Sequence, residues 1–185
     1  MKKYIYKILL LTCLGFLIQS TNLSFAQQTT GLGAFAGGGS FKGNFPSEGC
    51  FTSSVFFDFA APFMGGLTSR LSFVYATGTN VLLAKTNNTY NPFIRGFSLK
   101  ELITKNISNN FYFEGGLGPL VLNDRSFTSI NVWDAGFAFS ALAGIDFSNG
   151  NTPGVSAGFG TEYGLTFTKT SVQYFAVYLQ AKYSF

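Results

Sequence analysis

Charged side chains are few in this sequence, and six of them fall on the polar side of stretches in which polar and apolar residues alternate. They are Asp58, Arg70, Glu114, Asp134, Glu162 and Lys182. Gathered on one face, such residues could line an ion path or form a paired-carboxylate hydrolytic site. A network of ion pairs that neutralises buried charge is the interpretation we favour, because an unpaired buried charge is very costly. Within this network, we expect Glu162 to pair with Lys182 on the neighbouring strand.

Other residues that could carry chemistry point to no reaction. The chain contains no His, so the commonest general base and metal ligand is missing. The segment Gly31–Ala36 (GLGAFA) matches a dinucleotide-binding fingerprint only superficially, because Gly37–Gly39 would disrupt the helix that must follow it. We expect no catalytic residues, no cofactor and no metal.

The first 26 residues have the features of an export signal. Three lysines precede an apolar run at Ile8–Ile18, which is too short for a transmembrane helix, and Ser24–Ala26 fits a cleavage site. The sequence therefore predicts a cleaved signal peptide at 1–26 and a mature domain at 27–185. The signal holds three of the 12 Lys+Arg and none of the 8 Asp+Glu, so the mature chain is nearly neutral and no nucleic-acid partner is expected. Cys50 is then the single cysteine, without an internal disulfide partner.

Alternation with a period of two recurs along the mature chain and predicts eight strands. Two segments are less regular: Gly31–Phe41 is too rich in Gly for its faces to be assigned, and Pro92–Ile103 places Arg95 in phase with Phe97. The latter suggests a β-bulge or an arginine at the membrane interface. Six segments are clear: Phe51–Phe59, Leu67–Tyr75, Phe111–Leu117, Trp133–Phe147, Gly154–Phe167 and Ser171–Phe185.

The two faces of these strands differ in a way that favours a membrane barrel. Charged residues make up 11% of the chain and aromatic residues 18%, whereas an average soluble domain is about 25% charged. Small residues with about one charge per strand suit the narrow interior of an eight-stranded barrel, and bulky aromatics suit a lipid-facing wall. We therefore predict an all-β fold, an eight-stranded antiparallel up-and-down transmembrane β-barrel. A soluble, secreted calycin-like barrel is the alternative.

The links between strands predict the orientation of the barrel. Three long links are expected outside the cell, at Lys42–Cys50, Thr77–Asn91 and Leu120–Asn131, and the shorter ones in the periplasm, at Ala61–Gly66, Thr104–Asn110 and Ser148–Pro153. The seventh link, Lys169–Thr170, is expected to be tight. Cys50 would lie at the rim of the first outside loop, where an impermeant maleimide should label it.

The last nine residues, Val177–Phe185 (VYLQAKYSF), resemble the carboxy-terminal signal by which the Bam machinery recognises outer-membrane proteins. The pattern consists of Leu179, Ala181, Tyr183 and Phe185 at alternate positions. The mature chain is similar to the small eight-stranded barrels of the OmpA-transmembrane and opacity-protein type, and most similar to the outer-membrane β-barrel domain proteins of Bacteroidota. This resemblance implies a location in the outer membrane, with outer-membrane lipid and lipopolysaccharide as surroundings and the Bam machinery as a partner during assembly.

The resemblance implies no shared catalytic residues. Barrel enzymes similar to lipid A deacylases or omptin-type proteases depend on a histidine, which this chain lacks. The expected function is therefore non-enzymatic: a structural or interaction barrel, acting as an accessory subunit of a larger outer-membrane complex for protein insertion or secretion. A small channel or transporter and a surface adhesin are the alternatives.

Overall fold

The computed structural model describes residues 30–43, 46–61, 67–79, 90–108, 110–148 and 153–185. The predicted signal peptide at 1–26 lies outside the described residues. No helix long and apolar enough to span a membrane occurs among the residues described. The regular structure consists of β1 (Gly31–Lys42), β2 (Glu48–Ala60), β3 (Thr68–Gly78), β4 (Phe93–Asn106), β5 (Phe111–Arg125), β6 (Val132–Asp146), β7 (Gly154–Thr166) and β8 (Gln173–Ser184).

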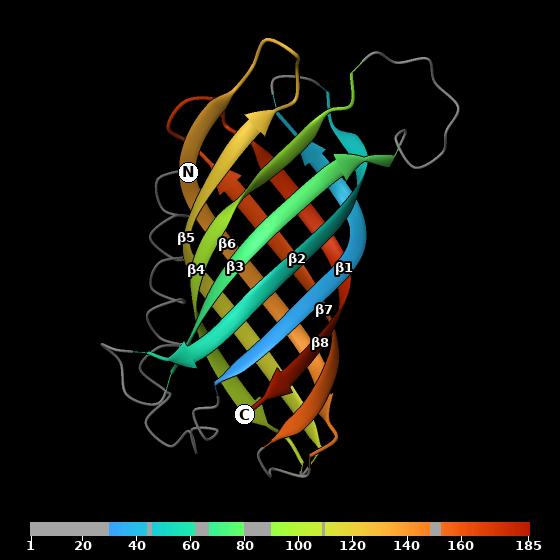
Figure 1. Ribbon diagram of the computed structural model, residues 1–185, viewed down its shortest axis with the longest axis vertical. Helices are drawn as coiled ribbons and strands as arrows, with labels where there is room; N and C mark the ends of the chain where they lie inside the picture. The colour runs from blue at the N-terminus through green and yellow to red at the C-terminus, as the bar shows by residue number, and fades with distance from the viewer. Residues whose placement is uncertain (1–29, 44–45, 62–66, 80–89, 109, 149–152) are drawn as a thin grey trace, which may run out of the picture.

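Each strand pairs antiparallel with its neighbours in the chain, and β1 also pairs with β8, so the sheet is a closed barrel (Figure 1). The strands tilt strongly against the barrel axis. Starting from Ser40, near the end of β1, the register partners on β8, β7, β6, β5, β4, β3 and β2 lead in turn to Phe59. Phe59 lies next to the partner of Gly31, the first residue of β1, so one circuit of the barrel shifts the register by almost the whole length of that strand. This confirms the predicted eight-stranded antiparallel up-and-down barrel. We call the end at which β1 finishes the outer end, and the end at which β8 finishes the inner end.

The alternation of large and small residues sets which face of each strand points outward. In β8, Phe175 and Leu179 are exposed on the outer wall, whereas Tyr174 and Tyr178 are buried inside. The outer wall is therefore largely apolar and the buried charges lie in the interior, which is the reverse of a soluble barrel. A wall of this kind suits lipid, in which a closed barrel leaves no unpaired strand edge.

Glycines allow the narrow barrel to close, and they settle the faces of β1. A Cβ at Gly39 would lie 1.8 Å from the carbonyl oxygen of Phe175, and one at Gly37 would lie 2.0 Å from that of Val177. Only a residue without a side chain fits where the coiled strands approach this closely. The alternate positions of β1 that point inward also include Phe35 and Phe41, which are buried.

Two predicted details of the strands are wrong, and one of the two alternatives for Arg95 is excluded. β5 continues to Arg125, so half of the predicted third outside link is strand, and its Asp124 is buried. The link between β7 and β8 comprises residues 167–172 instead of the tight turn at Lys169–Thr170. Arg95 pairs in regular register with Tyr75 and Asn123, so there is no bulge at this position. Its side chain is exposed on the outer wall near the outer end.

Candidate functional site

Arg70 is the centre of a buried charge cluster inside the barrel. Its Nε and Nη2 donate to the two carboxylate oxygens of Asp58 at 2.6 and 2.8 Å, a forked arrangement that matches guanidinium to carboxylate. Its Nη1 donates to Glu114 at 2.8 Å and to the amide oxygen of Gln180 at 3.1 Å. The guanidinium carbon lies 4.0 Å from the centre of the Phe56 ring. Every donor direction of the buried guanidinium thus meets a partner, as its burial requires.

Lys182 joins this cluster and does not pair with Glu162 as the sequence suggested. Its Nζ lies 3.4 Å from Oδ2 of Asp58. The register explains the difference, because Glu162 faces Ala176 across the β7–β8 ladder whereas Lys182 faces Ser156. The structure therefore brings together Asp58, Arg70, Glu114 and Lys182 and places Glu162 in another group.

That second group comprises Glu162, Lys100 and Tyr174. Lys100 Nζ bonds one carboxylate oxygen of Glu162, and the Tyr174 hydroxyl donates to the other at 2.6 Å. All three side chains are buried. Lys100 was not among the predicted residues, although the signal was present: since Arg95 and Phe97 share one face of β4, the even-numbered positions face inward.

The lumen ion pairs balance in charge. Three carboxylates are matched with three cations: Asp58, Glu114 and Glu162 with Arg70, Lys100 and Lys182. Each of these three carboxylates is bonded to at least one cation. The arrangement is what a structural network needs, because it compensates charge taken out of water.

Asp134 has a different role from the other five predicted residues, because it binds the link between β7 and β8. It lies near the outer end and accepts hydrogen bonds from the hydroxyls of Thr166 (2.8 Å), Thr168 and Thr170 (3.0 Å). Four consecutive backbone N–H groups, those of residues 168–171, also donate to it at 2.8 to 3.1 Å. One carboxylate thus organises the β7–β8 link, in which Ser171 has a left-handed φ of 52°.

Apolar side chains fill much of the remaining lumen. One cluster lies around the stacked rings of Phe35 and Tyr178, whose centroids are 4.2 Å apart. A second cluster fills the outer half and comprises Phe41, Cys50, Val74, Ala76, Ile94, Leu120, Leu122, Ala138, Val172 and Tyr174. The interior is therefore a packed core in the part of the chain that the structure describes.

Cys50 belongs to this outer cluster, and its predicted place in an exposed loop is wrong. It is the third residue of β2, is 1% exposed, and its Sγ lies 3.5 Å from the hydroxyl of Thr52. The polar residues that precede it suggested a loop. The strand in fact begins at Glu48, so Cys50 already points into the barrel.

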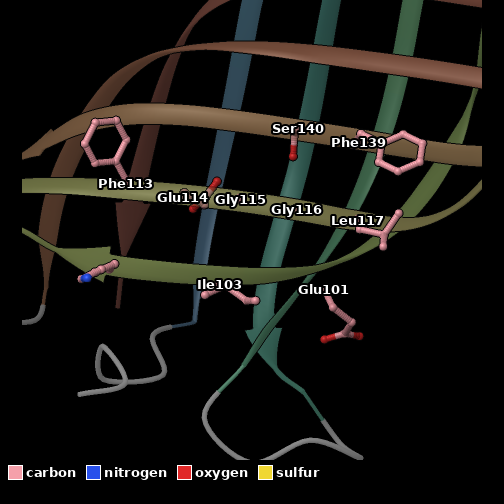
Figure 2. A pocket seen from close by; sticks show the side chains of 10 residues that line it. Glu101, Ile103, Phe113, Glu114, Gly115, Gly116, Leu117, Phe139 and Ser140 are labelled. Atoms are coloured by element: carbon pink, nitrogen blue, oxygen red, sulfur yellow. The ribbon is translucent and has the colours of Figure 1, made fainter. Parts of the chain in front are cut away.

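The outer wall carries a feature that the sequence analysis did not find. A shallow groove of about 530 Å³ crosses β4, β5 and β6. Figure 2 shows Gly115 and Gly116 between Phe113 on one side and Leu117 and Phe139 on the other. A Cβ added at Gly115 would meet no atom within 4 Å, so the groove is open at its floor.

The predicted assembly signal lies on the outer wall. Leu179, Ala181 and Tyr183 are exposed on the outward face of β8, and Phe185 is exposed directly after the strand. The backbone N–H of Phe185 donates to the carbonyl oxygen of Thr30 at 2.9 Å. The chain terminus is thus tied to the strand that closes the barrel.

Metal chemistry finds no support in the described ranges, where no three His, Cys, Asp or Glu side chains are grouped so that they could hold an ion. The buried charges of the lumen are engaged with one another, and Asp134 is occupied by the β7–β8 link. What the arrangement can do is rigidify the barrel from within.

Comparison with solved structures agrees with this architecture. No protein-family model matches the chain, and no curated protein sequence matches it. Neisserial surface protein A (NspA) superposes with a TM-score of 0.57 at 11% identity, covering 84% of this chain and 97% of that one. Ail, the attachment invasion locus protein of Yersinia pestis, gives a TM-score of 0.50 at 12% identity. The match covers 86% of this chain and 100% of Ail. The chain has the fold of the small outer-membrane β-barrels.

At these identities the likeness concerns the fold alone. It agrees with the general type inferred from the terminal strand, a small eight-stranded outer-membrane barrel. The narrower resemblance to the Bacteroidota proteins stays a prediction.

Proposed function

We propose that this protein is a non-enzymatic, integral outer-membrane barrel that acts through its outer surface, as an accessory subunit of a larger outer-membrane complex for protein insertion or secretion. One observation carries the proposal: the lumen is packed around a charge-balanced ion-pair network, whereas the outer wall is largely apolar and hollowed by a groove. A barrel whose interior is filled has only its wall and its links with which to act.

Membrane insertion is supported by the size of the exposed apolar side chains. Phe97, Leu117, Phe159 and Leu179 are each at least half exposed on four different strands of the wall. In water this surface would be strongly aggregation-prone. In lipid it is the expected outward band, and the outward-facing Arg95 near the outer end suits the phosphate groups of lipopolysaccharide.

Assembly by the Bam machinery is part of the proposal, and Phe185 provides its test. Deleting Phe185, or replacing it with Lys, should lower the amount of folded, heat-modifiable protein in the outer membrane while export continues. The three signal residues on the outward face of β8, together with Phe185 directly after the strand, would be available to a receptor before the barrel closes. Normal assembly of both variants would contradict the assembly signal.

A small channel is the rival function, and one pair of measurements separates the two. The purified barrel should give no stable single-channel conductance in planar bilayers, because Phe41, Ile94, Leu122 and Tyr174 fill the outer half of the lumen. In mild detergent it should co-purify with one defined larger outer-membrane barrel. A stable opening without such a complex would favour the channel.

A further inference from the structure

The groove across β4, β5 and β6 has the shape of a docking surface on the wall. Its floor includes Ile103 and Gly115, which are register partners on β4 and β5, and Ala141, the partner of Gly115 on β6, lies next to it. Gly115 and Ala141 are small and exposed, whereas the next outward positions, Leu117 and Phe139, stand up as a rim. Small residues let another backbone approach closely within a membrane.

Glu101 lines the same groove and is an unusual residue for this wall. It lies on the outward face of β4, in the same alternating row as Leu99 and Ile103. The Ser69 hydroxyl donates to its Oε1 at 2.7 Å. Its Oε2 is buried and has no hydrogen-bond partner among the described residues. A carboxylate oxygen of this kind needs a donor, and none of the described residues supplies one.

The depth of Glu101 makes the missing donor more significant. Lys105 lies four residues further along β4, close to the inner end. Four residues of strand span about 13 Å, and a tilt of about 40° leaves about 10 Å of this along the membrane normal. Glu101 therefore lies within the apolar band, where ionisable residues are costly and mark functional positions.

Lipid and a second copy of this chain both fit the groove poorly. At this depth a lipid offers hydrocarbon, which has no donor for Oε2. In a twofold pair about the membrane normal, residues at equal depth meet, and with the axis beside the groove Glu101 would face the same carboxylate of the second copy. The outward cations of β4, Arg95 and Lys105, lie six and four residues from Glu101 along the strand and so at other depths.

We propose that this groove is the docking site for the wall of a different outer-membrane barrel, which places a cationic or hydroxyl side chain against Glu101. The inference rests on the proposed function and names the surface through which the accessory subunit binds. The partner wall would lie over Gly115 and Ala141, between Phe113 and the rim of Leu117 and Phe139.

Photo-crosslinking in intact cells tests this surface. A benzophenone-bearing phenylalanine replaces Ile103 in the groove or, as control, Leu32 on the opposite wall. The Ile103 probe should yield one adduct with an integral outer-membrane barrel, identified by mass spectrometry, and the Leu32 probe should not. Gly115→Leu should lower the adduct at least tenfold by filling the groove, and Glu101→Gln, which keeps an acceptor for Ser69, at least threefold.

Gly38→Leu is the matched control, since it adds the same side chain to another exposed glycine, on β1, whose Cβ would meet no atom closer than 3.7 Å. It should leave the adduct unchanged, and heat-modifiable mobility shows that each variant is folded. Adducts with phospholipid or with a second copy only would overturn the proposal. Co-purification with a larger barrel that survives Gly115→Leu would overturn the groove but leave the proposed function standing. Absence of any complex with the unaltered protein would overturn both.

Discussion

Replacing Arg70 with Met should destabilise the barrel more than any other single change in the lumen. The substitution keeps much of the side-chain volume beside Phe56 but removes the partner of two buried carboxylates, those of Asp58 and Glu114. Lys182 would be the cation left near Asp58, at 3.4 Å, and Glu114 would lose both of its bonds to the guanidinium.

The magnitude follows from the burial of the stranded groups. Asp58 is fully buried and Glu114 nearly so, and breaking a buried ion pair by removing one partner costs about 3–5 kcal/mol. The triple variant Asp58→Asn, Arg70→Met, Glu114→Gln carries no uncompensated carboxylate at this place. It should recover more than half of the loss, because most of the cost comes from unpaired charge rather than from lost attraction.

Unfolding in detergent by urea gives the measurement, followed by heat-modifiable mobility and by the fluorescence of Trp133, the single tryptophan. The Arg70→Met midpoint should fall clearly, with that of the triple variant between it and the unaltered protein. If Arg70→Met changed the free energy of unfolding by less than about 0.5 kcal/mol, the usual range for surface substitutions, the network would not be stabilising the fold.

Three further predictions concern other parts of the barrel. Asp134→Asn should weaken the β7–β8 link by about 1–3 kcal/mol, seen as faster tryptic cleavage after Lys169; equal cleavage rates would contradict this role. Gly136→Ala should lower the free energy of unfolding by about 1–3 kcal/mol, because its Cβ would lie 1.8 Å from a carbonyl oxygen. Gly115→Ala should be neutral in the same urea titration, because its Cβ would meet no atom within 4 Å. The reverse order would refute the assignment of inward and outward faces. Cys50 should resist maleimide in the folded barrel and react after unfolding, and labelling on intact cells would show that β2 starts later than Glu48.

The strands could be predicted from the sequence wherever the inward residues are small or polar and the outward ones bulky. Gly154–Phe167 and Trp133–Phe147 each match the observed β7 and β6 to within one residue at either end. The signal fails at the outer end of β5, where inward Leu120 and Leu122 belong to the apolar cluster and alternation disappears. A polar tail at Asn123–Arg125 then imitates a loop.

The charge network could be predicted only as a set of inward positions. Alternation says that a side chain enters the lumen, but not which residue it meets there, since that depends on register and stagger. Glu162 therefore finds Lys100 on β4 across the lumen instead of Lys182 on the adjacent strand. The role of Glu101 could not be predicted from the sequence for another reason. It depends on two neighbours in the fold, Ser69, which donates to the carboxylate, and Gly115, which leaves the groove floor open.

The pairing of β1 with β8 has a consequence for how the chain must fold. Gly31 and Ser184 are register partners although almost the whole described part of the chain separates them. This contact has the longest sequence separation in the ladder, so the loop entropy that it costs is met last and folding is expected to be slow. A chain that stops before β8 would carry two unpaired edges, each a template for pairing with another molecule. The barrel can therefore close only once β8 is present. A catalyst that keeps the edges of β1 and β7 from pairing wrongly until β8 is available would act at the slowest step of folding.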